Sequence, residues 1–201
     1  MEPIFVLVGF LGAGKTYCLE KLIDSYIEQQ YNPFVILNDY ENANIDAQHL
    51  LKHVDRRHFK ALHGSCICCS GMDELRSFVN GIPQREKPVT LIEANGTTDA
   101  CSLMGFLGVG ISDRFNPPVQ ISIVDVRYWK KREMHNQLEA SQVQVSSLIV
   151  MNHTEKCGAE RVDQVRKSIL TINPTASIIS MHTLSPSYLS ELTHNYHAHT
   201  P

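Results

Sequence analysis

Short apolar runs alternate with stretches whose apolar residues recur at helical spacing over most of the chain. The apolar runs are rich in Val, Ile and Leu, a composition and length typical of β-strands. They predict strands over residues 3–8, 33–38, 88–94, 118–126, 146–152 and 176–181. The stretches between them predict helices over residues 15–30, 46–54, 72–80, 98–107, 127–142 and 158–171, and a short helix over residues 186–193.

The order of these elements predicts the fold class. Strands that alternate with helices form a mainly parallel sheet with helices on both faces, so the expected class is α/β. The runs VLV, VIL, LIE and LIVM are apolar without alternation, as strands buried on both faces are. We expect residues 1–182 to form one domain and residues 183–201 to form a polar, histidine-containing C-terminal tail.

Charge and composition exclude several classes of protein. The formal net charge is −3, so no basic field favours binding to nucleic acid or to an anionic membrane. No window is apolar for long enough to cross a membrane, and the N-terminal MEPIFVLVGF lacks the basic region of a signal peptide. The expected location is therefore the cytoplasm. Because the cytosol is reducing, the 6 cysteines are expected to be free, metal-bound or catalytic rather than a disulfide framework.

The stretch GFLGAGKT, residues 9–16, lies between the first expected strand and the first expected helix. It matches the pattern G-x-x-x-x-G-K-[ST] in the strand–loop–helix context that a phosphate-binding P-loop requires, which makes the fold that of a P-loop NTPase. Lys15 is expected to reach the β- and γ-phosphates, and the Thr16 hydroxyl to bind Mg²⁺. The nucleotide-binding candidates in this segment are Gly9, Gly12, Ala13, Gly14, Lys15, Thr16 and Tyr17.

Two further segments carry groups that a γ-phosphate site needs. LIEANG ends a buried strand with Glu93, whose carboxylate is suited to hold a metal-bound water, and the N–H of Gly96 is suited to meet the γ-phosphate. The alternative is an ordinary charged strand end that leads into a turn. Residues 37–46, LNDYENANID, carry Asp39 and read as a switch segment ordered by the γ-phosphate and Mg²⁺; the alternative is a solvated acidic loop.

The segment after the strand 146–152 is the candidate for base recognition. GTPases usually read guanine with N-K-x-D, and here the corresponding residues are Asn152, His153, Thr154 and Glu155. A glutamate can accept two hydrogen bonds from the guanine edge, and His153 can stack where a lysine stem would pack. A preference for guanine is expected, with Asn152 and Glu155 as the binding residues.

Cys66, Cys68 and Cys69 lie together in HGSCICCSG, residues 63–71. Thiolates are soft ligands and favour Zn²⁺ or Cu⁺ over Mg²⁺. Zinc prefers four ligands, so three sulfurs leave one position. That position is open to Asp39, Glu41, His63, water or a ligand from a client protein. Two alternatives remain open at this point, a buried apolar turn and a redox-active C-x-x-C pair formed by Cys66 and Cys69.

Several motifs together resemble a known family. In this order, GFLGAGKT, LNDYENANID, CICC, LIEANGTTD, VDV and NHTE resemble the CobW-type metallochaperone GTPases, relatives of the UreG and HypB maturation factors. The resemblance covers nearly the whole chain. It implies GTP hydrolysis coupled to capture and delivery of a transition metal, commonly zinc. It assigns phosphates and Mg²⁺ to Gly12, Gly14, Lys15 and Thr16, metal to Cys66, Cys68 and Cys69, the γ-phosphate side to Glu93 and Gly96, and the base to Asn152 and Glu155.

The sequence also departs from the family's pattern. Asp39 stands where the family usually has Glu, and members usually continue into a smaller C-terminal domain, so the resemblance implies a GTPase domain without that addition. The tail instead carries His194, His197 and His199, which read either as loose zinc ligands or as part of a polar tail.

The expected protein is a slow GTPase that binds zinc and acts as a metallochaperone. Its cofactors are GTP, Mg²⁺ and Zn²⁺, its partners are a transition metal ion and a client metalloprotein, and a homodimer that depends on nucleotide or metal is compatible with this interpretation. The catalytic candidates are Lys15, Thr16, Asp39 and Glu93, and the metal candidates are Cys66, Cys68, Cys69, Asp39 and Thr16. Two rival functions stay open: a zinc buffer or sensor with a weakened nucleotide site, and a P-loop kinase for a small molecule.

Overall fold

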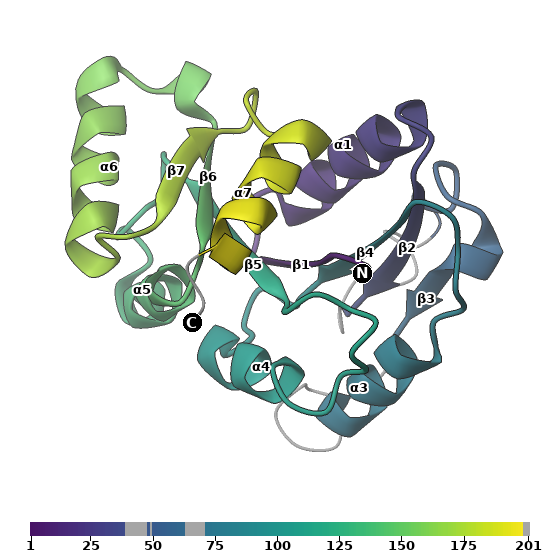
Figure 1. Cartoon of the computed structure of the whole chain (residues 1–201). Helices are drawn as coiled ribbons and strands as arrows, with labels where there is room; N and C mark the ends of the chain where they lie inside the picture. Colours follow the sequence, from purple (N-terminus) through teal and green to yellow (C-terminus); the bar gives the residue numbers. More distant parts are fainter. Residues whose placement is uncertain (39–47, 49, 63–70, 199–201) are drawn as a thin grey trace.

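The computed structural model describes residues 1–38, 48, 50–62 and 71–198, with side chains described as far as residue 193. Its centre is a seven-stranded sheet in the order β3-β2-β4-β1-β5-β6-β7 (Figure 1). Every neighbouring pair of strands is parallel. The carboxyl ends of the strands therefore meet along one edge of the sheet, where ligands bind in open α/β folds.

The elements alternate along the chain as the sequence predicts. The strands are β1 (Ile4–Val8), β2 (Asn32–Leu37), β3 (Phe59–Ala61), β4 (Pro88–Glu93), β5 (Val119–Asp125), β6 (Leu148–Asn152) and β7 (Ser177–Ser180). The α-helices are α1 (Lys15–Glu28), α3 (Gly71–Gly81), α4 (Ala100–Leu107), α5 (Asn136–Gln144), α6 (Ala159–Ile172) and α7 (Pro186–Ala198). Short 3₁₀ turns are η1 (Arg56–His58), η2 (Glu133–His135) and η3 (Thr154–Lys156).

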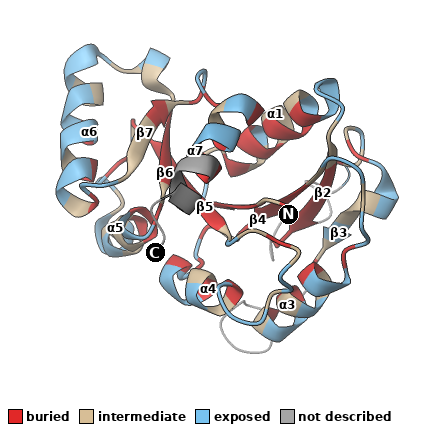
Figure 2. Cartoon of the chain, in the orientation of Figure 1, coloured by how far each residue is buried: buried red, intermediate tan, exposed pale blue. Residues whose placement is uncertain are grey.

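Helices cover both faces of the sheet, and the strands between them are buried (Figure 2). On one face, Leu7 of β1 packs with Leu22 of α1 and Leu189 of α7. On the other face, Val6 of β1 packs with residues of α3 and α4, while Ile149 of β6 packs with α5 and α6. The predicted class, an α/β parallel sheet with helices on both faces, is confirmed.

The helix predicted over residues 127–142 is wrong in its first half. Residues 126–130 form a turn, η2 follows, and α5 begins only at Asn136. The Asp125 side chain accepts a hydrogen bond from the backbone N–H of Arg127, and this local bond competes with helix formation. Lys130 and Glu133 also adopt positive φ angles of 57° and 50°, a left-handed conformation that ends any right-handed helix.

Three smaller differences concern short or terminal elements. The strand β3 was not predicted, because three residues between charged neighbours show no periodicity. The helix predicted over residues 46–54 lies partly outside the described residues, and residues 51–53 of it form a turn. The helix predicted over residues 186–193 extends to Ala198 and packs on α1 through Leu189, so this part of the expected tail contacts the core.

Candidate functional site

The glycine loop joins the end of β1 to the start of α1 at the carboxyl edge of the sheet. The loop closes on itself through a hydrogen bond from the N–H of Ala13 to the carbonyl of Phe10. Gly9 and Gly12 have positive φ angles, and Gly14, with φ 97°, is the residue from which α1 starts. Lys15 is buried at the first position of α1. The loop therefore aims the N-terminus of α1, with its partial positive charge, at the edge where phosphates would bind.

Thr16 and Glu93 come from different elements and meet at this edge. The Thr16 hydroxyl donates to the Glu93 carboxylate at 3.0 Å, and Glu93 is buried at the end of β4, next to β1 in the sheet. A hydroxyl and a carboxylate side by side are oxygen ligands of the kind that Mg²⁺ prefers. The two residues therefore fit the magnesium position that the sequence assigned to them.

Cys18 lies one helical turn into α1 and does not belong to the reactive part of this site. It is completely buried, and burial, together with the Glu93 charge, raises the pKa of its thiol above the ordinary range. Because the thiolate is the form that attacks and binds metal, Cys18 stays an inert packing residue.

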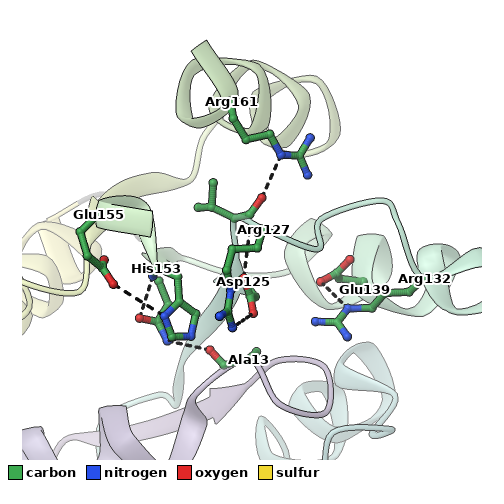
Figure 3. Close-up of polar contacts among 10 residues, drawn as sticks. Ala13, Asp125, Arg127, Arg132, Glu139, His153, Glu155 and Arg161 are labelled. Carbon is green, nitrogen blue, oxygen red and sulfur yellow. Dashed lines mark hydrogen bonds and ion pairs between the residues drawn. The ribbon is translucent and has the colours of Figure 1, made fainter. Parts of the chain in front are cut away.

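Asn152 fastens the end of β6 to the glycine loop. Its side-chain Nδ2 donates to the carbonyl of Ala13 at 2.9 Å, and its Oδ1 accepts from the N–H of His153 at 2.9 Å (Figure 3). A Cβ on Gly14 would overlap the Asn152 amide, so the loop and the strand end approach as closely as a glycine allows. The predicted base segment and the predicted phosphate segment are thus one connected unit.

A pocket of about 300 Å³ opens beside this unit. The residues that line it come from the glycine loop, α1, the β6–α6 connection and the end of β7: Gly14, Tyr17, Asn152, His153, Glu155, Lys156, Met181 and His182. Inside it, His153 Nδ1 lies 3.8 Å from Glu155 Oε1, and the Glu155 side chain is 52% exposed. The carboxylate is therefore accessible to a purine edge, as base recognition requires.

The structure adds pocket residues that sequence reasoning missed. Met181 and His182 directly follow β7, and the Lys21 ammonium on α1 donates to the carbonyl of Met181 and holds this connection in place. The available signal was position, since Met181 ends and His182 follows the last expected strand, 176–181, of a parallel sheet.

Asp125 at the end of β5 anchors a polar network on the other side of the loop (Figure 3). Burial alone would raise the pKa of Asp125, but hydrogen bonds and charge from Arg127, which approaches to 2.7 Å, outweigh burial and lower the pKa below its usual value. Arg161 of α6 fixes the turn that follows, because its guanidinium donates to the carbonyls of Val126 and Trp129. The signals in the sequence for this network were the position of Asp125 at a strand end and its place in the VDV motif.

Arg132 and Glu139 form the second part of the network. Arg132 Nε lies 3.5 Å from Glu139 Oε1, and its guanidinium stacks 4.5 Å from the ring centre of Phe10 in the glycine loop. The His135 ring also lies 5.2 Å from the Phe10 ring. Burial raises the pKa of Glu139 in spite of the opposing charge of Arg132. The segment before α5 is therefore packed directly against the glycine loop.

Gly96 lies in the loop after β4 and touches the glycine loop from the sheet side. A Cβ on Gly96 would lie 2.7 Å from the backbone nitrogen of Leu11, a contact that real side chains do not make. Glycine is therefore required here for close approach of two backbones rather than for an unusual φ angle. Glu93 and Gly96, which the sequence paired as one motif, both contact the loop or helix that would hold the phosphates.

Some predicted site residues lie outside the described residues: Asp39, Cys66, Cys68 and Cys69. The residues that lead into their segments are described. Asn38 donates its N–H to the carbonyl of Glu93, and Leu62 donates its N–H to the carbonyl of Leu37. Among the described residues, no group of three or more His, Cys, Asp and Glu side chains is arranged to hold a metal ion.

The fold and the site together are those of a P-loop NTPase. They combine a parallel sheet, a glycine loop that leads into Lys15 and Thr16, and the Glu93 carboxylate at the end of β4, the neighbour of β1 in the sheet. Residues 3–180 match the family model described as CobW/HypB/UreG, nucleotide-binding domain. The chain therefore belongs to the CobW/HypB/UreG family, a family of P-loop GTPases.

Named relatives agree with this assignment. The chain is 25% identical to zinc-regulated GTPase metalloprotein activator 1 of Dictyostelium discoideum, over 88% of this chain and 45% of the relative. It is 26% identical to the zinc chaperone YjiA of Escherichia coli, over 90% of this chain and 58% of YjiA. The chain thus spans about half the length of the curated relatives it matches.

Solved structures share the fold. HypB from Helicobacter pylori in complex with nickel superposes with a TM-score of 0.58 at 16% identity, over 98% of this chain and 86% of HypB. Zn(II)-bound YjiA from Escherichia coli superposes with a TM-score of 0.55 at 20% identity, over 89% of this chain and 57% of YjiA. Within the part of the chain that is described, every helix is too short or too polar to cross a membrane.

Proposed function

We propose that this protein is a zinc-binding GTPase that acts as a metallochaperone and couples GTP binding and hydrolysis to the capture and delivery of a transition metal, with zinc as the metal. The observation that carries the proposal is the hydrogen bond between Thr16 and Glu93, at 3.0 Å. It joins the phosphate-binding helix to a strand end that is also bonded to the start of the predicted switch segment.

The chain of contacts from the phosphate site toward the cysteines supports the coupling. The backbone carbonyl of Glu93 accepts a hydrogen bond from the N–H of Asn38, and residues 39–46 of the predicted switch follow Asn38 directly in the sequence. The backbone carbonyl of Leu37 accepts a hydrogen bond from the N–H of Leu62, and the cysteine segment 63–71 follows Leu62. The described residues that lead into the two segments therefore follow adjacent strands, β2 and β3, and β2 is the neighbour of β4 in the sheet.

The residues of the site have separate tasks in the proposed reaction. The glycine-loop N–H groups and Lys15 bind the phosphates and compensate their charge, while Thr16 and Glu93 would hold Mg²⁺. When bound, Mg²⁺ supplies charge neutralisation at the transferring phosphoryl group. Arg127 and Arg132 lie at the same edge but are engaged with Asp125 and Glu139, so neither acts as an arginine finger without breaking its ion pair. Slow intrinsic hydrolysis is the expected result.

Guanine is the expected base because the pocket holds an exposed carboxylate beside Asn152. The edge of guanine carries N–H donors on N1 and N2, and the Glu155 carboxylate can accept a hydrogen bond from each of them. The corresponding edge of adenine does not carry these two donors. The His153 ring, 3.8 Å from that carboxylate, limits where Glu155 can lie. The expected order of affinity is therefore GTP and GDP above ATP.

The test compares thiol variants of the whole chain. The variant Cys66→Ser/Cys68→Ser/Cys69→Ser should lose stoichiometric zinc binding and the response of GTP hydrolysis to zinc. The matched control is Cys101→Ser/Cys157→Ser, which removes an exposed thiol and a half-buried one that lie elsewhere. The control should keep both properties. Zinc stoichiometry is measured by atomic absorption after dialysis, and hydrolysis by phosphate release with and without zinc.

Three results would contradict the proposal in different ways. Equal zinc content and equal rates in both thiol variants would remove the cysteines from the mechanism. Tight zinc binding without GTP binding would instead favour a zinc buffer or sensor. Phosphate transfer to an added small molecule, in place of release to water, would favour a kinase. Delivery to a client metalloprotein is tested separately, by transfer of zinc to an apo-acceptor in the presence of GTP or GDP.

A further inference from the structure

Gln142 on α5 contacts the loop that carries Gly96, although it lies far away in the sequence. Its side-chain Nε2 donates to the carbonyl of Gly96 at 3.2 Å and to the carbonyl of Thr98 at 3.1 Å. Both acceptors are carbonyl oxygens, so only the nitrogen end of the amide can face them, and its two hydrogens match the two acceptors. Gln142 is 1% exposed, so no water competes for these bonds.

The end of α5 from which Gln142 projects is itself held in place. The backbone carbonyl of Gln142 accepts hydrogen bonds from Gln120 Nε2 at 2.6 Å, Ser122 Oγ at 3.0 Å and Ser146 Oγ at 2.8 Å. Gln120 and Ser122 belong to β5, the strand next to β1 in the sheet. Asn173, after α6, adds bonds to the carbonyls of Val143 and Ser146. The amide of Gln142 is therefore presented from a fixed support rather than from a free helix end.

The same loop also contacts the glycine loop. Gly96 approaches the backbone nitrogen of Leu11 so closely that a Cβ would not fit between them. Gly96 is thus held by contacts with both Leu11 and Gln142. Asp99 then caps α4 with bonds to the N–H groups of Cys101 and Ser102, so the far end of the loop is also fixed.

We propose that Gln142 is a positioning residue for the γ-phosphate: by holding the carbonyls of Gly96 and Thr98, it fixes the position of Gly96, whose N–H would meet that phosphate. The Gly96 carbonyl shares its planar peptide unit with the N–H of Thr97, whereas the Gly96 N–H lies on the other side of the Gly96 Cα. Gln142 therefore acts on the Gly96 N–H through the position of that Cα, which the close approach to Leu11 also limits. This inference rests on the proposed function, because it assigns a role in distinguishing GTP from GDP at the same site.

The experiment compares two variants that remove hydrogen bonds from buried side chains. Gln142→Met removes the two bonds from Gln142 Nε2, and the control Thr90→Val removes the bond from the Thr90 hydroxyl to Glu2 Oε1 at 2.6 Å; the two residues are 1% and 0% exposed. Of these two residues, only Gln142 bonds the loop after β4. Both variants should therefore lose thermal stability, but only Gln142→Met should lower the ratio of affinities for a non-hydrolysable GTP analogue and for GDP. The expected fall is roughly tenfold, the size expected when about two modest hydrogen bonds are lost.

A second measurement needs no nucleotide. Hydrogen exchange of the backbone amides from residues 95–99 should accelerate in Gln142→Met and stay close to wild type in Thr90→Val. If Gln142→Met does not fold, Gln142→Asn serves in its place, because its amide is one methylene short of the two carbonyls.

The outcomes separate this inference from the proposed function. Equal affinity ratios in the two variants, or equal exchange at residues 95–99, would show that Gln142 has only a structural role and would overturn the inference. A wild-type protein that binds no guanine nucleotide would refute the proposed function instead, while faster exchange confined to Gln142→Met would still establish that Gln142 orients the loop.

Discussion

The bond between Asn152 and the glycine loop can be removed with almost no change of shape by the substitution Asn152→Asp. The new carboxyl oxygen would replace Nδ2, which donates to the Ala13 carbonyl at 2.9 Å, and would face that carbonyl with no hydrogen to share when ionised. The other oxygen would still accept from the N–H of His153 at 2.9 Å. The substitution therefore removes one defined contact, retains its neighbour and adds one negative charge to the pocket lining.

The size of the effect follows from burial. Asn152 is 6% exposed, so the Ala13 carbonyl would be left without its partner in a place that water reaches poorly. Loss of such a bond costs about 1–3 kcal/mol. Without nucleotide the loop can relax and avoid part of this cost, but a bound nucleotide requires the loop to return to its closed form. We therefore expect the affinity for GDP to fall by about 5- to 150-fold, the factor that corresponds to this energy.

The matched control is Asn173→Asp. Asn173 is also 6% exposed, and its Nδ2 donates to the carbonyls of Val143 and Ser146, each at 2.9 Å. It lies after α6, outside the pocket lining. The control should unfold at a lower temperature and bind GDP as the wild type does at temperatures where it is folded. Affinity is measured by calorimetry, and stability by thermal denaturation followed by circular dichroism.

One result would refute the reasoning. If Asn152→Asp lowered the unfolding temperature as much as Asn173→Asp did, but bound GDP with unchanged affinity, the bond to Ala13 would stabilise the fold without shaping the nucleotide site. Protonation of the introduced carboxylate could restore the bond at low pH, so the affinity of the Asn152→Asp variant should recover partly on acidification, and the control offers no such recovery.

Two further predictions concern the metal and pH. Thr16→Val keeps the shape of the side chain but removes the hydroxyl that bonds Glu93. The nucleotide affinity measured with Mg²⁺ should therefore exceed the affinity measured with a chelator by a smaller factor in this variant than in the wild type, in titrations with a fluorescent nucleotide. An unchanged factor would exclude Thr16 as a magnesium ligand. Asp125 has a lowered pKa in the folded state, because burial, which would raise it, is outweighed by the bonds and charge of Arg127 and a smaller contribution from His153. The contribution of Asp125 to stability is thus fully present above the unfolded-state pKa of 3.8 and is lost as the pH falls through the lower folded-state value. The substitution Asp125→Asn should therefore lower the free energy of unfolding most near neutral pH and progressively less below 3.8. A loss of stability that does not vary with pH would contradict this prediction.

The parts of this protein that sequence could predict are those encoded locally. The glycine loop is recognised because its glycines, Lys15 and Thr16 are close in sequence and stand between a strand and a helix. Glu93 could be assigned to the same site as Thr16 because it ends a buried strand and is followed three residues later by Gly96, as the γ-phosphate side of a P-loop requires. The strand runs themselves were clear, since buried parallel strands are almost uniformly apolar.

The missed features depend on contacts between distant segments. Residues 127–142 form a charged stretch between two expected strands and were expected to be one helix, yet the Asp125 side chain accepts a hydrogen bond from the N–H of Arg127 and the chain turns before a helix forms. No periodicity reveals that the Arg132 guanidinium will stack on Phe10, or that Gln142 will bond the loop of Gly96. Such side chains read as polar surface in the sequence, and only the packing of α5 against the sheet makes them part of the site.

The burial of Cys18 has a practical consequence for thiol chemistry on this protein. Because its sulfur is inaccessible and its thiolate is strongly disfavoured, an alkylating reagent should reach it only when the chain opens globally. Cys101, by contrast, is exposed and should be labelled in the native protein. The rate at which Cys18 is labelled would therefore report the rate of global unfolding. The labelling rates of the other thiols in the chain can be compared with it, and a thiol that reacts faster than Cys18 reacts without global unfolding.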